Sequence, residues 1–271
     1  MRTTIPRTRG AAWSAGLTST LLTAACAAPA QHGARPAPVG PIATDRPGFL
    51  FSSTLVPDGR LQVEAGSPLL AFDEPPGDSL SLVTLPLQLR YGLLPGLELR
   101  AGGPAYNWLD TDSAPSESGA GDAEVGVKVP LGLPLGQDSA ALLFGLRLPT
   151  GADAFQVDDP APNVNAVSSW AIDERTSLTG LAGLAYTPVD GGEDPLTAAL
   201  AGLASRALGA GFTGCVELAW FPAWRGADTA YAGLLLTKLL GDDVQLDASV
   251  DRGLTDDSSD WLVGIGFAVR M

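Results

Sequence analysis

The chain has 271 residues, which is enough for one sizeable domain or for one closed barrel of moderate strand number. Hydrophobic residues make up 45% of it and charged residues only 17%, below the roughly 25% of soluble domains, so a strongly charged soluble surface is excluded. The net charge is −14, and nucleic acid is excluded as a partner because phosphate binding needs a basic face.

Residues 1–30 have the features of an export signal. A start with three arginines precedes an apolar, small-residue stretch, and the small residues that close it fit cleavage after Ala30. A lipoprotein is the alternative, because the residues before Cys26 loosely resemble a lipobox, but ordinary cleavage is the favoured interpretation. After cleavage only Cys215 remains, so we expect no disulfide.

Residues 31–57 are rich in Pro, Ala and Gly and are predicted to be extended and weakly structured. We expect a periplasmic N-terminal segment here, followed by the main domain at residues 58–271. No apolar run after residue 30 reaches the roughly 18 residues that a membrane helix requires. If the protein lies in a bilayer, it must span it with strands.

From residue 60 onward, apolar and polar residues alternate with the two-residue period of a half-buried strand. The alternation is cleanest near the C-terminus, where Val244, Leu246 and Ala248 alternate with polar residues. Other segments are less regular, because small residues occupy many of their positions. The twelve predicted strands lie near residues 61–66, 83–91, 97–102, 122–129, 139–149, 164–172, 177–187, 196–207, 212–221, 229–239, 244–251 and 261–270.

The connections between these segments differ by parity. Those that follow odd-numbered strands are long and acidic, whereas those that follow even-numbered strands are tight, except for residues 131–138. Short turns on one side and long loops on the other are typical of outer-membrane barrels, in which the long loops are extracellular. The sequence therefore predicts an all-β fold, a transmembrane antiparallel up-and-down β-barrel of about twelve strands in the cell outer membrane.

In such a barrel one face of each strand meets lipid and the other faces a lumen that can hold water and charge. Polar and charged residues within otherwise apolar strands are then candidates for the lumen face. These candidates are Gln88, Arg90, Glu98, Arg100, Glu124 and Lys128.

Thr44, Asp45, Arg46 and Pro47 form a short polar motif in the N-terminal segment. We predict that Asp45 and Arg46 make a salt-bridged turn that docks the segment against the periplasmic mouth of the barrel. The alternative is that both side chains are merely exposed.

The residues needed for common hydrolytic or metal chemistry are missing from the sequence. The only histidine, His32, lies in the Pro- and Ala-rich segment, and Cys215 has no histidine to activate it. There is no Cys/His metal cluster and no glycine-rich phosphate loop before a helix. We therefore expect no enzymatic activity, no catalytic residues, no cofactor and no metal.

Two stretches carry a family resemblance beyond this pattern. Residues 42–66 resemble the opening, and residues 251–267 the ending, of the bacterial outer-membrane family described as putative MetA-pathway phenol-degradation proteins, often called transporters. Residues 147–151 are similar to a strand end in the middle of the same family. The resemblance implies a barrel of about twelve strands and the uptake of small compounds, aromatic or hydrophobic ones among them, and it implies no catalytic residue.

The leading hypothesis is a porin-like outer-membrane channel or transporter for passive passage of small compounds in a Gram-negative cell. Its expected partners are outer-membrane lipid and lipopolysaccharide, the outer-membrane assembly machinery and a small-molecule solute. The rival is a structural or adhesive outer-membrane protein with a closed lumen and acidic surface loops. A secreted soluble sandwich is a third interpretation, which membrane fractionation would separate from the other two.

Overall fold

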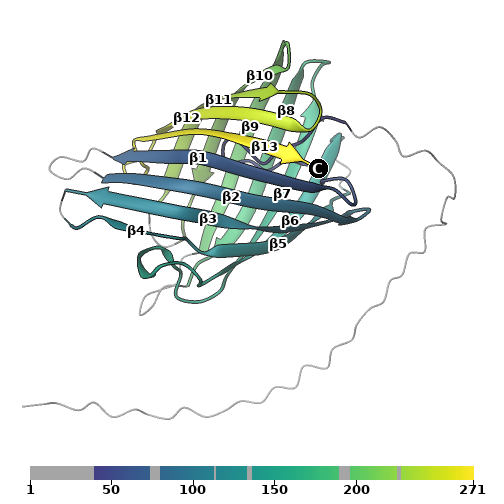
Figure 1. Ribbon diagram of the computed structural model, residues 1–271. Coiled ribbons are helices and arrows are strands. Elements are labelled where there is room, and N and C mark those ends of the chain that lie inside the picture. The colour runs from purple at the N-terminus through teal and green to yellow at the C-terminus, as the bar shows by residue number, and fades with distance from the viewer. Residues whose placement is uncertain (1–39, 74–79, 113, 133–135, 189–195, 225–226) are drawn as a thin grey trace, which may run out of the picture. The chain divides into compact units, whose positions relative to one another are not determined.

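The computed structural model describes a single sheet with short connections at one end (Figure 1). The expected export signal, with Cys26, lies outside the described residues, as do His32 and the first part of the N-terminal segment. The described residues are 40–271 without 74–79, 113, 133–135, 189–195 and 225–226. The strands are β1 (Leu61–Asp73), β2 (Leu80–Leu94), β3 (Leu97–Thr111), β4 (Glu117–Gly119), β5 (Ala123–Pro130), β6 (Ser139–Leu148), β7 (Ala161–Ala171), β8 (Thr176–Tyr186), β9 (Leu196–Gly209), β10 (Phe212–Phe221), β11 (Thr229–Leu239), β12 (Val244–Gly253) and β13 (Trp261–Arg270).

The sheet closes on itself. Strand β1 pairs antiparallel with β2 on one side and with the last strand, β13, on the other, so that Val63 lies opposite both Leu89 and Val269. Strand β3 pairs with β2 and β5, while β4 pairs only with one end of β3. The twelve strands other than β4 therefore form a closed antiparallel barrel, which confirms the predicted fold class and strand number.

The strands differ from the expected segments mainly at β1 to β3, which are longer than predicted. Strand β3 continues past the break in alternation at Gly103, which has φ of +138° and is followed by Pro104 opposite Pro86 at a register shift in β2. The loop expected after β3 also contains β4. The helical structure among the described residues is one 3₁₀ turn, Asp153–Phe155. Among the described residues, no helix has the length and apolar character to cross a membrane.

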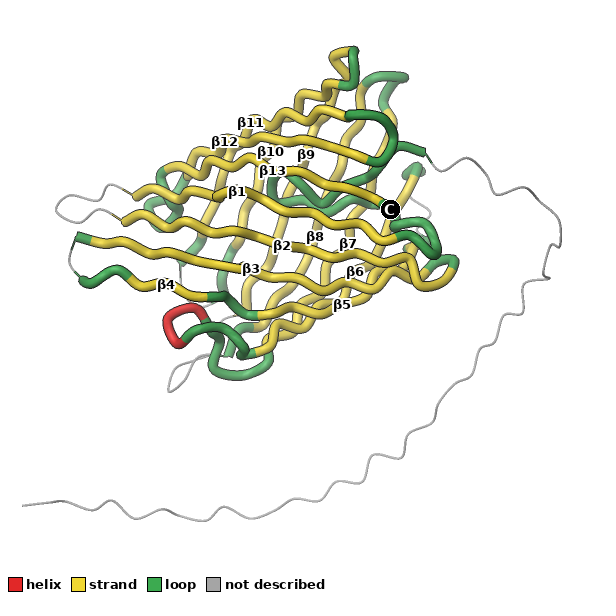
Figure 2. Tube along the Cα trace, in the orientation of Figure 1, coloured by secondary structure: helices red, strands yellow, loops and turns green. Residues whose placement is uncertain are grey.

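Both ends of the barrel domain lie at the end of the sheet that carries the tight turns. Leu61 and Met271 exchange two backbone hydrogen bonds there, with N–O distances of 3.1 and 2.8 Å. The turns between β2 and β3, β9 and β10, and β11 and β12 are at this same end, which Figure 2 shows near the label C. We call it the short-turn end and the opposite one the long-loop end.

The two faces of the barrel wall have opposite polarity, and the polar face points inward. Six of the seven largest fully buried side chains are polar or charged, with Arg90, Glu98 and Lys128 among them. Large apolar side chains such as Leu234 and Ile265 are instead more than half exposed on the outside. An apolar exterior around a polar interior is the arrangement that a lipid-embedded barrel requires, because the outer face replaces water with acyl chains.

We expect Ile265→Arg, in the middle of β13, to lower the free energy of unfolding by about 2–4 kcal/mol in lipid vesicles, since a charge at the bilayer midplane loses its hydration. Leu208→Arg is the matched control, because Leu208 is equally outward but lies one residue from the end of β9, where the cost falls to about 0–1 kcal/mol. Urea unfolding in vesicles measures both. Equal, small effects would contradict a lipid-facing position for Ile265.

Candidate functional site

Residues 40–60, which we call the inner segment, enter the barrel interior and return to the same end of it without forming a helix or strand. Near its start, Ile42 donates a backbone hydrogen bond of 2.7 Å to Asp242 O in the β11–β12 turn. Near its end, Asp58 forms an isolated bridge with Gly92 of β2. Its prolines lack the N–H that a regular strand pairing would need, which suits the irregular path between these two anchors. The inner segment is thus held at the short-turn end at both of its ends.

Asp45 is the most densely bonded side chain of the inner segment. Its carboxylate lies 2.5 Å from Arg100 Nη2, 3.2 Å from Arg90 Nη1 and 3.8 Å from Lys128 Nζ. It also accepts a 2.7 Å hydrogen bond from the backbone N–H of Ser52. Burial opposes ionisation of Asp45, but the attraction of Arg100, Arg90 and Lys128 outweighs it and holds the pKa of this carboxyl well below its ordinary value.

Arg90 connects Asp45 to two acidic residues of the barrel wall. Its Nε donates to Glu98 Oε1 and its Nη1 to Glu64 Oε1, both at 2.8 Å. Nη1 also donates to Ala43 O at 3.0 Å, and Glu98 Oε2 accepts the N–H of Val56 at 2.7 Å, so this wall also holds the inner segment by its backbone. We call this set the ion cluster, which balances three carboxylates against three cations. Its members are Asp45, Glu64, Arg90, Glu98, Arg100 and Lys128.

Arg46 points to the opposite wall. Its Nη2 lies 3.2 Å from Asp247 Oδ1 and also 3.2 Å from the carbonyl oxygen of Ile265. Gly66 and Gly266 make room for it, since a Cβ at Gly66 would come within 2.8 Å of the guanidinium and one at Gly266 closer still. The adjacent Asp45 and Arg46 are therefore bonded to different parts of the barrel wall.

Aromatic and hydroxyl contacts hold the rest of the inner segment. The ring of Phe49 stacks on Tyr231 with centroids 5.1 Å apart and meets the edge of Phe221 at 5.3 Å. The Phe49 N–H donates to Glu217 Oε2 at 2.9 Å. Further along, the hydroxyl of Ser53 lies 2.8 Å from Ser169 Oγ on β7. Contacts on several sides of the barrel thus fix one path for residues 40–60.

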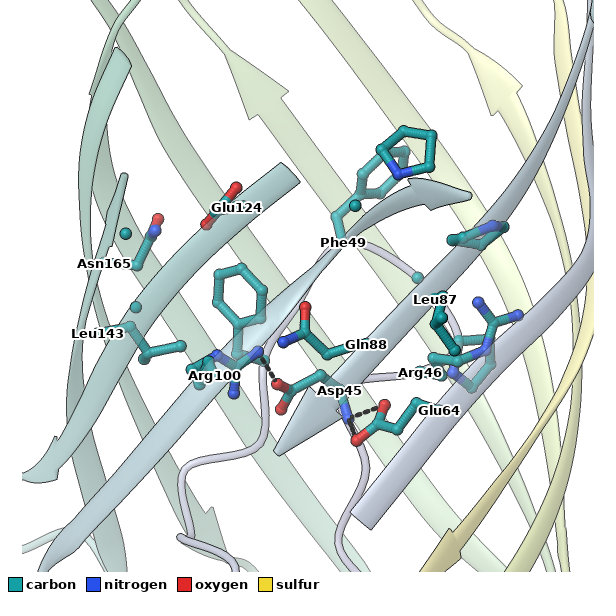
Figure 3. Close-up of a pocket in the computed structure, with 18 of the residues that line it drawn as sticks. Asp45, Arg46, Phe49, Glu64, Leu87, Gln88, Arg100, Glu124, Leu143 and Asn165 are labelled. Atoms are coloured by element: carbon teal, nitrogen blue, oxygen red, sulfur yellow. Dashed lines mark hydrogen bonds and ion pairs between the residues drawn. The ribbon is translucent and has the colours of Figure 1, made fainter. Parts of the chain in front are cut away.

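The inner segment separates two spaces in the lumen. A cavity of about 390 Å³ lies toward the long-loop end, where Phe49, Gln88, Glu124 and Asn165 are among its lining residues (Figure 3). A second space of about 310 Å³ lies toward the short-turn end and is lined in part by Cys215. Residues of the inner segment line both spaces. Material that passes along the barrel axis must therefore move past or displace this segment.

The candidate lumen residues fall into two groups in the structure. Gln88, Arg100 and Glu124 line the larger cavity. Arg90, Glu98 and Lys128 are also on the inner face, but they are completely buried beneath the inner segment. In the motif at residues 44–47, Thr44 Oγ1 accepts a 2.8 Å hydrogen bond from Gln245, and Pro47 lines both spaces.

Several inward side chains were not among the lumen residues predicted from the sequence. Asp247 and Asp251 occupy the polar positions of the alternation in β12, so the pattern itself was sufficient to find them. Glu217 lies on β10, where the neighbouring positions of the inner face are the small residues Cys215 and Ala219. Asn163 and Asn165 lie on β7, where the inner face is not uniformly polar. Among the described residues no group of three His, Cys, Asp or Glu side chains is placed to hold a metal ion.

Comparisons with known proteins agree with this architecture. The family model described as "Putative MetA-pathway of phenol degradation" matches residues 44–271. Among solved structures, an outer membrane channel from Pseudomonas putida F1 superposes with a TM-score of 0.62 at 13% identity, covering 80% of this chain and 97% of that one. The β domain of the Bordetella autotransporter BrkA superposes with a TM-score of 0.55 at 16% identity, covering 79% and 100%. These identities show a shared fold alone. The search of curated proteins found no match.

Proposed function

Because the chain belongs to the family described as "Putative MetA-pathway of phenol degradation", we propose that it is a passive outer-membrane channel for small apolar or aromatic compounds. The observation that carries the proposal is a closed barrel whose lumen holds a partly apolar cavity next to an inner segment that forms no helix or strand. Near its two ends the inner segment is held by a few backbone hydrogen bonds, and between them side chains make most of its contacts with the wall. It continues into β1 at residue 61. It can therefore leave the lumen while the barrel stays closed.

The channel lies in the outer membrane, with its outer face against lipid and lipopolysaccharide. Residues 1–30 direct export and are removed, and the assembly machinery inserts the strands. Transport through the channel is diffusive in this proposal, and we assign no enzymatic activity to the chain. The short-turn end faces the periplasm, as it does in outer-membrane barrels generally.

Uptake by cells tests this function. Cells that produce the protein should take up labelled phenol at low concentration faster than cells that lack it, and the difference should disappear when the outer membrane is permeabilised. The rival function, an adhesive or structural barrel with a closed lumen, predicts cation-dependent surface binding and no difference in uptake. That result would contradict the channel function and support the adhesive or structural one.

We expect the open lumen to prefer cations. When the inner segment leaves the lumen, it takes the opposite charges of Asp45 and Arg46 with it, so the excess cation left in the ion cluster is offset by the unpaired Asp247. Glu124, Glu217 and Asp251 have no basic partner among the described residues. The net field is therefore negative and raises the local concentration of cations. The reversal potential in a KCl gradient measures this preference, which Glu217→Gln with Asp251→Asn should reduce and Glu117→Gln, on exposed β4, should not. An anion preference of the natural sequence would contradict the charge assignment.

A further inference from the structure

We propose that the larger cavity is a binding site for a compact apolar molecule that carries a hydrogen-bond donor, with Glu124 as the acceptor. This inference rests on the channel function, because a ligand reaches the cavity through the lumen. The family description and the superpositions assign no residue to ligand binding. The proposal comes from three features of the cavity wall: a chain of amides that ends at Glu124, apolar side chains that line the same cavity, and an unbalanced charge.

The first feature is a hydrogen-bonded ladder across β5, β6 and β7. Asn165 Nδ2 donates to Asn163 Oδ1, and Asn163 Nδ2 donates to Glu124 Oε1, both at 3.2 Å. The ladder passes over Gly145 of β6, where a Cβ would come within 2.6 Å of Asn163 Nδ2 and closer to Glu124. One N–H of each of these two amides is thus used within the ladder. Glu124 lines the cavity, and its Oε2 accepts no hydrogen bond from the described residues.

The second feature is the apolar surface that the same cavity offers. Phe49 and Phe51 of the inner segment, Leu143 of β6 and Leu262 of β13 line it. Figure 3 shows Phe49 and Leu143 among them. The Arg100 guanidinium already covers one side of the Phe51 ring, with its Cζ 5.5 Å from the centroid. A cavity of about 390 Å³ is small for a ligand pocket. It therefore suits a molecule of about one ring and its substituent.

The third feature is the state of the charges that line the cavity. Both lining cations are occupied, Arg46 by Asp247 and Arg100 by Asp45 and Glu98. Asp251 Oδ1 is buried and has no hydrogen-bond partner among the described residues.

Another cation, Arg147, lies opposite Glu124 in the β5–β6 register. Its side chain is exposed, and the structure records no ion pair between the two. The cations that line the cavity are thus paired with carboxylates, whereas Glu124 and Asp251 have no basic partner among the described residues. It should favour molecules that donate a hydrogen bond and disfavour anions that only accept one.

Four single-ring compounds of similar size test the proposal: phenol and benzylammonium, which donate, toluene, which has no polar group, and benzoate, which only accepts. Binding to the purified full-length protein in amphipol is measured by equilibrium dialysis. We expect phenol or benzylammonium to bind at least about tenfold more tightly than toluene, and benzoate to bind most weakly. The stronger of the two donors shows whether the site takes neutral or charged ligands.

Variants separate the ladder from general apolar binding. Glu124→Leu should abolish the preference for donors and leave toluene binding unchanged, while Glu124→Gln should reduce the affinity for benzylammonium more than for phenol. Glu117→Gln, which removes an exposed carboxylate outside the lumen, should change neither. Toluene binding as tightly as both donors, or a donor preference that survives Glu124→Leu, would overturn the proposal. Either result could occur while phenol uptake by cells persists, so the channel function is tested separately.

Discussion

Replacing Asp45 by alanine should release the inner segment from the barrel wall. The change leaves Arg90, Arg100 and Lys128 with two carboxylates instead of three, in a place where little water reaches them. Removing one partner of a buried ion pair costs about 3–5 kcal/mol. When the segment leaves, water can hydrate the side chains of Arg90, Arg100 and Lys128, and this hydration lowers the free energy of the open state. We expect a lower free energy of unfolding and a channel that is open for a much larger part of the time in planar bilayers.

Asp58→Ala is the matched control for this variant. Asp58 is in the same segment and its side chain is exposed, and its bridge to Gly92 is made by the backbone. It should therefore change neither the stability nor the current. If Asp45→Ala conducts no more than Asp58→Ala and unfolds at the same urea concentration, the ion cluster does not hold the inner segment in place.

A covalent lock on the inner segment should have the opposite effect. The hydroxyl oxygens of Ser53 and Ser169 are 2.8 Å apart, so Ser53→Cys with Ser169→Cys places two thiols within reach of a disulfide. The background should carry Cys215→Ala, because Cys215 lines the same space. With the bond formed, the segment cannot leave, and both current and phenol uptake should fall to the level of membranes without the protein.

Reduction of the bond should restore transport in this variant. Ser53→Cys alone, in the same background, should conduct like the natural sequence with or without a reductant, which excludes effects of the thiol itself. Full transport through the oxidised double variant would show that solutes pass while the inner segment stays in the lumen.

The barrel was predictable because each strand of a closed membrane barrel has one face toward lipid and one toward the lumen, so apolar and polar residues alternate along it. We call this alternation the period-two signature. In β12 the signature is complete, and it was sufficient to place Asp247 and Asp251 on the inner face, although neither was named as a candidate. In β1 the register shifts between Ser67 and Leu70, and this irregularity hid the second half of the strand. In β3 the break at Gly103 had the same effect.

The candidate site was predictable only in part. Arg90, Glu98 and Lys128 are inward as the alternation indicated, but their burial depends on a segment that lies far away in the sequence. The partners of Asp45 come from β2, β3 and β5, and only closure of the sheet brings these strands around it. The ladder from Glu124 to Asn165 depends on the pairing register across Gly145, which residue composition does not reveal.

The channel function requires that residues 40–60 can leave an otherwise open lumen. Single-channel recording in planar bilayers, with the natural sequence and with a protein lacking residues 31–57, tests this most directly. We expect brief or small openings from the natural protein and a large, steady conductance from the shortened one, provided that the shortened barrel shows the β-sheet circular dichroism of the parent. A folded, shortened barrel that carries no current would contradict the account.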